Sequence, residues 1–220
     1  KAMKYLQEIF LEMWNETTKQ QVEGVAYYPQ FSGDTAIFDK SIAIVDRAPR
    51  IRSKEMRKTY AASIRSAQHC IQIVNPYFVP THSIREALKD ALASGVKVEI
   101  MISSKSDIPF TPEATFYLAH KLMKRGANIY LFNKGFHHSK IMMVDSLYCT
   151  VGSANLNSRS LRYDYETNAF IFSKQTTKEL SDLFEKDKKG SILLTPQRWK
   201  ERSNWKKFLG WFANLLTPFI

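Results

Sequence analysis

The run Val-Lys-Val-Glu-Ile-Met-Ile-Ser, residues 96–103, predicts a buried strand, because β-branched and other apolar residues fill most of it. Helical spacing of apolar residues precedes this run at Ser83–Ala93 and follows it at Pro112–Arg125, and a glycine lies just beyond each helix. Two further strand-like runs enclose these helices, at Cys70–Val74 and Asn128–Phe132. Strands that alternate with helices of this length predict an α/β sandwich with a largely parallel central sheet.

The same alternation continues on both sides of this core. We expect further strands at Ser41–Val45, near His138–Val144, at Tyr148–Gly152 and at Thr167–Phe172, with helices at Lys54–His69 and Thr177–Lys188. The strands near residues 138–152 follow one another closely, so the sheet can become mixed toward this hairpin. A helical pattern at Lys4–Trp14 and a tail from Gln197 onward stand outside the block.

Net charge is the most informative number in the composition. The 220 residues carry 32 Lys and Arg against 21 Asp and Glu, a formal net charge of +11. Such a surplus favours an anionic partner, which by composition alone is a nucleic acid, a phosphorylated substrate or an acidic membrane face. A hydrophobic content of 44% excludes a disordered tail, and the length is ample for a core.

The chain shows no sign of export or of crossing a membrane by itself. No apolar run approaches the roughly 20 residues of a spanning helix. Cys70 and Cys149 lie in apolar runs, as small core residues do, which favours a reducing compartment over a disulfide framework. Because the chain opens at Lys1 without a Met or a signal peptide, we expect it to be a piece of a longer protein.

The pattern His138-Ser139-Lys140, followed after four residues by Asp145, carries the chemistry. Residues 138 and 140 of a strand project to the same face, so that the imidazole and the ammonium meet one ligand. This pair suits a phosphate, because a lysine holds its charge while a neutral histidine can attack phosphorus. We therefore expect phosphoryl chemistry at the mouth of a buried strand.

A second group of polar residues follows in Gly152-Ser153-Ala154-Asn155. Ser153 and Asn155 can donate hydrogen bonds to phosphate oxygens, and Gly152 allows the backbone to approach a ligand closely. Further on, Glu166 can orient or stabilise a histidine by accepting its ring N–H. These residues extend the expected phosphate site.

Other candidate functional residues have weaker support from the sequence. A zinc site at His137, His138 and Cys149 lacks ligand spacing, and no P-loop or dinucleotide motif is present. Tyr77 and His82, after the turn at Pro76, could line a headgroup pocket, but we interpret them as ordinary loop residues. His137 is interpreted as a neighbour that faces away from the site. No metal or cofactor is expected.

Taken together, His138–Asp145 and Gly152–Asn155 resemble the signature of the phospholipase D superfamily, and in particular the C-terminal half of the bacterial cardiolipin synthases. Supporting stretches are Asn75–Pro80, Ser153–Ser160, Tyr163–Asn168 and Leu183–Trp199. The resemblance implies a phospholipase D-like sandwich of mixed sheet and flanking helices at 41–195. It also implies the last helix of a missing first half plus a linker at 1–40, and a basic amphipathic helix at 196–220.

The resemblance implies a phosphatidyltransferase, which converts two phosphatidylglycerols into cardiolipin and glycerol through a phosphohistidine. His138 would form the phosphohistidine or protonate the leaving alkoxide. Lys140 and Asn155 would bind the phosphoryl oxygens, with Ser153 assisting.

Asp145 belongs to the family motif but would serve structure behind the site, and Glu166 would pair with a histidine across the site. Because Lys, Asn and His supply charge stabilisation, no metal is implied.

The family's site needs two such motifs, and here no other histidine begins a His-x-Lys. The expected partners are therefore anionic phosphatidylglycerol, a membrane surface, and a missing N-terminal half or a second copy; nucleic acid is disfavoured. The implied location of the parent protein is the bacterial inner (cytoplasmic) membrane, with this chain soluble or peripheral on the cytoplasmic side. The chain alone is expected to be weak or inactive.

Two other functions stay open. One is a one-motif nuclease or phosphodiesterase that acts as a homodimer, in which the charge of +11 serves nucleic acid. The other is a basic membrane-binding module with a vestigial site.

The tail from Gln197 combines aromatic and basic residues. Large apolar residues recur at helical spacing, at Trp205, Phe208, Leu209, Phe212, Leu215, Leu216 and Phe219. Basic residues lie near its start, at Arg198, Lys200, Arg202, Lys206 and Lys207, against a single Glu201. This pattern predicts an interfacial membrane helix, and the alternative is a helix packed on its own domain or on the missing half.

Overall fold

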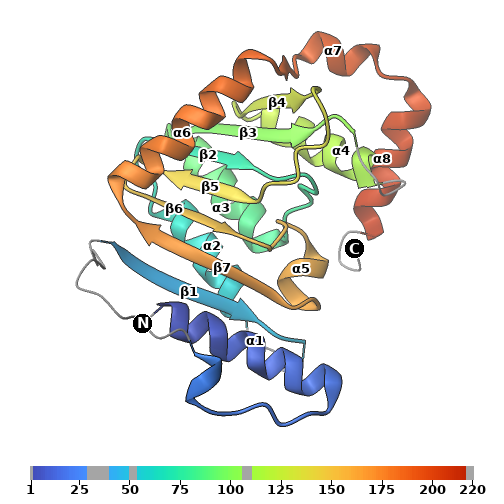
Figure 1. Ribbon diagram of the computed structural model, residues 1–220. Helices are drawn as coiled ribbons and strands as arrows, with labels where there is room; N and C mark the ends of the chain where they lie inside the picture. Colours follow the sequence, from blue (N-terminus) through green and yellow to red (C-terminus); the bar gives the residue numbers. More distant parts are fainter. Residues whose placement is uncertain (1, 29–39, 50–53, 106–110, 217–220) are drawn as a thin grey trace.

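A central sheet of eight strands organises the molecule, in a computed structural model that describes residues 2–28, 40–49, 54–105 and 111–216 (Figure 1). The strand order is β1-β7-β6-β5-β2-β3-β4-β8. The strands are β1 (Ser41–Arg47), β2 (Cys70–Val74), β3 (Lys97–Ser103), β4 (Asn128–Phe132), β5 (Ile141–Val144), β6 (Tyr148–Gly152), β7 (Glu166–Phe172) and β8 (Ile192–Leu193). The helices are α1 (Ala2–Thr18), the 3-10 turn η1 (Val25–Tyr27), α2 (Glu55–Arg65), α3 (His82–Ala93), α4 (Thr111–Met123), α5 (Ser158–Arg162), α6 (Lys174–Lys189), α7 (Pro196–Glu201) and α8 (Asn204–Leu216).

The sheet is mixed, with one parallel section. β2 pairs with β3 and β3 with β4 in parallel, whereas β1–β7, β7–β6, β6–β5, β5–β2 and β4–β8 are antiparallel. The α/β prediction and the expected change to a mixed sheet toward the hairpin are confirmed, but the parallel part is smaller than expected and is confined to β2, β3 and β4. The reason lies in the connections: three residues join β5 to β6, and a parallel connection needs a dozen or more.

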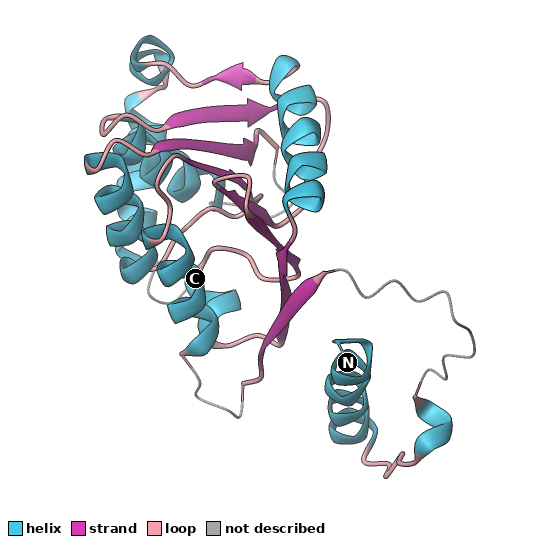
Figure 2. Cartoon of the chain, turned by 90° about the vertical axis from the view of Figure 1, so that its left-hand side faces the viewer, coloured by secondary structure: helices cyan, strands magenta, loops and turns pink. Residues whose placement is uncertain are grey.

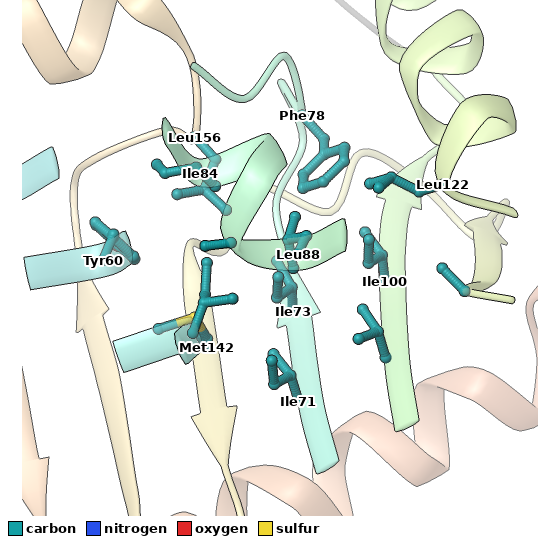
Figure 3. Packing of buried hydrophobic residues seen from close by; sticks show 14 of the residues in the cluster. Tyr60, Ile71, Ile73, Phe78, Ile84, Leu88, Ile100, Leu122, Met142 and Leu156 are labelled. Atoms are coloured by element: carbon teal, nitrogen blue, oxygen red, sulfur yellow. The ribbon is translucent and has the colours of Figure 1, made fainter. Parts of the chain in front are cut away.

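Helices cover both faces of the sheet (Figure 2). On the face of α2, α3 and α4, the main core joins Ile73 of β2 and Ile100 of β3 to Leu88 of α3 (Figure 3). On the face of α6, Met101 packs in a second cluster with Phe184. Because side chains alternate between the two faces, a slip of one residue would exchange the clusters, and burial therefore fixes the register.

A buried carboxylate lies under α6. Glu99 of β3 is 1% exposed, and its Oε1 accepts hydrogen bonds from Lys188 Nζ at 2.7 Å and from the Tyr130 hydroxyl at 3.2 Å. Its Oε2 lies 3.0 Å from Lys97 Nζ and 3.2 Å from Gln72 Nε2. Burial acts to raise the pKa of Glu99, but these donors more than offset it and hold the pKa below its ordinary value.

Helix α1 lies beside β1, the strand at one end of the sheet (Figures 1 and 2). The Tyr5 hydroxyl donates to Asp46 Oδ1 at 2.9 Å, and the Tyr165 hydroxyl donates to Glu16 Oε2 at 2.6 Å. The helix expected at Lys4–Trp14 is thus confirmed, and most of the expected linker, residues 29–39, lies outside the described residues.

The C-terminal tail forms two helices, α7 and α8, where the sequence predicted one. The chain turns at Arg202, whose guanidinium pairs with Glu113 of α4 and lies 4.1 Å from the centre of the Phe116 ring. Helix α8 crosses α4 closely at Gly210, where an added Cβ would lie 2.7 Å from the Glu113 carbonyl oxygen. Within the described part of the chain, no helix is long and apolar enough to cross a membrane.

Candidate active site

Polar residues from several loops meet at one edge of the sheet. β2 and β6 end there, and β5 and β7 begin there, on the right-hand side of Figure 1. The loops at this edge carry Asn75, His138, Lys140, Ser153 and Asn155, and β7 begins here with Glu166. Of the residues proposed from the sequence, only Asp145 lies elsewhere.

Lys140 is fixed directly before β5. The residue is 7% exposed, and its Nζ donates to the backbone carbonyl oxygen of His138 at 2.7 Å. Because β5 begins at Ile141, His138 and Lys140 lie in the preceding loop and not in the strand that the sequence predicted. The pairing of β2 with β5 stops at Val74, the partner of Ile141, and the chain then turns away toward Pro76.

The His138 imidazole is exposed at the surface but lies against two aromatic rings. Its centre is 6.2 Å from that of Tyr77, edge to face, and 5.2 Å from that of Phe136. Tyr77 is 7% exposed, so this loop residue is buried beside the imidazole. Packing on these rings orients the imidazole, while the exposed part of the ring can meet a ligand.

His137, in contrast, faces α6. Its Nε2 lies 3.2 Å from Asp187 Oδ2, and its ring packs edge to face on Phe132. The two neighbouring histidines therefore point to different parts of the molecule, as expected. Across the described residues, no group of three or more His, Cys, Asp and Glu side chains could hold a metal ion.

Asp145 lies at the far end of β5, at the opposite edge of the sheet. Its carboxylate accepts hydrogen bonds from the backbone N–H groups of Gln68, His69 and Cys70 at 2.7 to 2.8 Å. Asp145 and Ser146 have φ of 52° and 57°, as the two central residues of a tight hairpin turn require. Burial acts to raise the pKa of Asp145, but the backbone donors hold it below its ordinary value. These contacts match the structural role that the resemblance implied.

We expect Asp145→Asn to lower the free energy of unfolding by about 2 kcal/mol, because a neutral amide weakens charge-assisted bonds to three backbone donors. A folded-state pKa below the unfolded value gives stability that is complete above about pH 4 and is lost as the pH falls through the folded-state pKa. Urea unfolding from pH 3 to pH 7 should therefore show a gap between the two proteins that narrows in acid. Asp182→Asn, at an exposed pair with Lys178, is the matched control and should change little. An equal effect of both substitutions would contradict the anchoring role.

Ser153 is bound to Glu166. Its Oγ donates a short hydrogen bond to Glu166 Oε2 and accepts one from the Thr167 N–H at 3.0 Å. Glu166 is 8% exposed at the start of β7. The Ser153 hydroxyl proton therefore points to this carboxylate. Because Ser153 lies at the sheet edge that carries His138, Glu166 lies at that edge too.

Gly152 allows β7, and not a ligand, to approach closely. A Cβ at this position would overlap the carbonyl oxygen of Thr167 and the side chain of Asn168. The close approach of β6 and β7 brings Ser153 within hydrogen-bond distance of Glu166. Gly152 therefore positions these two site residues by allowing the strands to pack closely.

Asn168 is a positioning residue that the sequence reasoning missed. Its side chain is fully buried, its Oδ1 accepts from the Ala154 N–H at 3.1 Å, and its Nδ2 donates to the Tyr60 hydroxyl at 2.8 Å and to Thr150 Oγ1 at 3.3 Å. This amide holds the turn that carries Asn155. An amide inside a predicted strand, directly before four apolar residues, was the available signal.

Asn155 lies on a loop held from both sides. The next residue, Leu156, donates its N–H to the Asn75 side chain at 3.3 Å, and its carbonyl oxygen accepts from the Val79 N–H at 3.1 Å. Asn155 Oδ1 is buried and has no hydrogen-bond partner among the described residues. The loop is therefore already ordered, and the capacity that Asn155 Oδ1 retains is that of a hydrogen-bond acceptor.

Comparison of the fold with solved structures identifies the class. The structure matches phosphatidylserine synthase from Haemophilus influenzae with a TM-score of 0.65 at 16% identity, over 88% of this chain and 51% of that protein. It matches Nuc, a phospholipase D family member from Salmonella typhimurium, with a TM-score of 0.61 at 18% identity, over 71% of this chain and 99% of that protein. The chain therefore has the fold of this phospholipase D family member.

Sequence comparison then identifies the family. Residues 60–188 match the model described as cardiolipin synthase, PLD-like domain, and the chain belongs to this family. The cardiolipin synthase of Listeria monocytogenes is 36% identical over 222 residues, which cover 100% of this chain and 45% of that protein. Cardiolipin synthase 1 of Staphylococcus epidermidis is 36% identical over 233 residues, covering 96% and 48%. The matches lie in the C-terminal halves, so the chain spans about half the length of these curated relatives.

Proposed function

We propose that this chain provides the C-terminal half of a phosphatidyltransferase site, which joins two phosphatidylglycerols into cardiolipin and releases glycerol. The observation that carries the proposal is the placement of His138 and Lys140 at the same edge of the sheet as Glu166. Relatives named cardiolipin synthase, 36% identical over the whole chain, support the choice of reaction.

The reaction divides into two displacements at phosphorus. In the first, an imidazole nitrogen bonds to the phosphorus of one phosphatidylglycerol, the bond to its headgroup glycerol breaks, and the leaving alkoxide takes a proton from an opposing histidine. In the second, the terminal hydroxyl of another phosphatidylglycerol attacks that phosphorus and returns its proton to the opposing histidine, and the P–N bond breaks. His138 takes one of these two roles.

The other site residues stabilise charge or orient the reacting groups. The buried Lys140 ammonium and the Asn155 amide would bind the non-bridging phosphoryl oxygens, where negative charge develops. Glu166, held by Ser153, would accept the ring N–H of the opposing histidine and so fix its tautomer. Asp145 would stabilise the hairpin and take no part in the chemistry.

The opposing histidine has to come from a second phospholipase D-like half. Of the five histidines in this chain, only His138 begins a His-x-Lys. An N-terminal half or a second copy of the chain would complete the site at the edge that carries His138. The chain alone should then turn over weakly or not at all.

Lipid analysis tests the proposed function. The complete gene product, expressed in a bacterium without cardiolipin synthase, should produce cardiolipin and one glycerol for each cardiolipin formed. Phosphatidic acid without cardiolipin would replace the transferase by a hydrolase. Salt-dependent cleavage of DNA by a symmetric dimer of this chain would favour the nuclease alternative, and vesicle binding without turnover the vestigial module.

We also propose that α8 rests on an anionic membrane. Helix α8 turns its small residues Gly210 and Ala213 toward α4. Five of its large apolar residues are between 45% and 65% exposed, and we call them the apolar row: Trp205, Phe208, Trp211, Phe212 and Leu215. The nearby cations are Arg198, Lys200, Lys206 and Lys207, since Arg202 is bound to Glu113. Aromatic rings beside lysines are typical of the headgroup region of a bilayer.

We expect the double substitution Trp205→Ser and Trp211→Ser to weaken binding to phosphatidylglycerol vesicles by about 10-fold or more, because each exposed indole contributes on the order of 1 kcal/mol at an interface. Vesicle flotation measures the effect. Leu147→Ser, at an exposed apolar residue in the turn after β5, is the control and should bind as the wild type does. Unchanged flotation of the tryptophan variant would show that the row does not meet the membrane.

A further inference from the structure

Three arginines gather next to the candidate active site. Arg47 ends β1 and is the strand partner of Glu166, and it is 4% exposed. Arg57 lies in α2 and Arg162 ends α5, the short helix that follows Asn155. Burial, together with repulsion from Arg162 and Arg47, lowers the pKa of the Arg57 guanidinium, so the three positive charges interact across these elements.

Two of these guanidinium groups lack the carboxylate partner that three other arginines of the described chain have. Arg65 pairs with Asp90, Arg159 with Asp164, and Arg202 with Glu113. In contrast, Arg57 and Arg162 form no ion pair with the residues that the structure describes, and the Nε of each is buried without a hydrogen-bond partner among them. Buried cationic donors without partners are costly in free energy, and an anion would relieve both the repulsion and the missing bonds.

The place of the cluster indicates which anion it meets. Arg47 and Glu166 are paired across β1 and β7, and Glu166 is bound by Ser153, which lies two residues before Asn155. A second anion site here therefore adjoins the expected phosphoryl site of Lys140 and Asn155. Arg47 and Glu166 also line a cavity of about 200 Å³ to which α1 contributes Glu12 and Glu16, and these carboxylates would repel an anion from that cavity. The arginines that remain to bind an anion are therefore Arg57 and Arg162.

We infer that Arg57 and Arg162, with Arg47 beside them, form a second phosphate-binding site, which takes the phosphodiester of the acceptor phosphatidylglycerol. This inference rests on the proposed function. Cardiolipin carries two phosphodiesters joined through one glycerol, so the acceptor phosphate must lie close to the phosphorus under attack. Guanidinium groups suit this task, because their planar N–H donors bind two phosphate oxygens at once without competing as nucleophiles.

The first test observes the arginines directly. The 220-residue chain is titrated at low ionic strength with glycerophosphoglycerol, the deacylated diester of phosphatidylglycerol, and separately with inorganic phosphate, while NMR follows the arginine Nε–H signals. The diester should shift the signals of Arg57 and Arg162 and leave Arg65 and Arg159 in place. No shift, or an equal shift at all four arginines, would overturn the site. A response to inorganic phosphate but not to the diester would assign the site to free phosphate and overturn the lipid assignment.

The second test uses the complete gene product. Arg57→Gln with Arg162→Gln should raise the phosphatidylglycerol concentration for half-maximal cardiolipin synthesis by about 10-fold or more, while attack by water on the first phosphatidyl group continues. Arg65→Gln, on the same helix as Arg57 but paired with Asp90, is the control. An unchanged concentration dependence in the double variant would overturn the inference.

Stability separates a misfolded variant from a defective site. Arg57→Gln should raise the melting temperature in phosphate-free buffer, because it removes a repelled charge; a lower value would indicate a structural role and count against the inference. Failure of the proposed function is distinguishable, because a wild type that makes no cardiolipin contradicts that function while the diester titration still decides the site. If the wild type makes cardiolipin but the diester does not shift the arginine signals, the second phosphate site is refuted and the proposed function stands.

Discussion

Replacing His138 by alanine should lower cardiolipin formation by the complete gene product at least about 10³-fold, because the proposed route has no other imidazole from this half for its role. The Tyr77 and Phe136 rings pack on this imidazole, so the substitution removes the reacting group and leaves the loop bond from Lys140 in place. Mass spectrometry of total lipid measures the product, and circular dichroism checks the fold.

The adjacent histidine provides the matched control. His137 bonds to Asp187 of α6 and packs on Phe132, so His137→Ala should change the rate only a few-fold while costing some stability. A brief reaction with a phosphatidylglycerol analogue that lacks the terminal hydroxyl should leave a phosphatidyl group on the nucleophile. A label on His138 assigns it as the nucleophile, and a label on the opposing histidine assigns His138 as the acid. Cardiolipin synthesis retained by His138→Ala would refute both assignments.

Lys188→Met should lower the free energy of unfolding by about 3 kcal/mol, because it removes one cation from a carboxylate that is 1% exposed. The Lys188 Nζ bonds to Glu99 Oε1 at 2.7 Å, and Glu99 cannot reach water to replace that bond. Urea unfolding at pH 7 measures the loss, and Lys189→Met, at the exposed neighbour on α6, is the control.

Acid should reduce this difference. The pKa of Glu99 is depressed in the folded chain, so the stability it contributes is complete above the unfolded carboxyl pKa of about 4.3 and disappears as the pH falls through the folded-state value. The gap between wild type and Lys188→Met should then narrow below about pH 4. A gap that stays constant from pH 7 to pH 3 would show that packing, and not charge, accounts for the loss.

Much of the fold could be predicted from local patterns. The strands at Cys70–Val74, Asn128–Phe132 and Tyr148–Gly152 have the predicted bounds, because each is a short apolar run between turn residues. β8 was missed, since its two residues form a strand only through pairing with Tyr130 and Leu131, far away in the sequence. Strand direction was also beyond a local pattern, because it depends on which neighbours meet.

The candidate site could be predicted as a set of residues but not as an arrangement. His138 and Lys140 lie close together because their spacing is local, although a loop and not a strand holds them. The bond between Ser153 and Glu166 spans a helix and a turn, and no spacing rule predicts it. The catalytic roles of these residues stay predictions until the experiments above are done.

The geometry of β5 gives a meaning to the spacing of the motif itself. Lys140 precedes the strand at one edge of the sheet, and Asp145 follows it at the other, with four strand residues between them. At about 3.3 Å per residue, those four residues span roughly 13 Å, the width of the sheet at this point. The interval between the two motif residues therefore equals the distance from the sheet edge that carries His138 to the hairpin turn that Asp145 stabilises. An insertion in this interval would displace either Lys140 or Asp145 from its position.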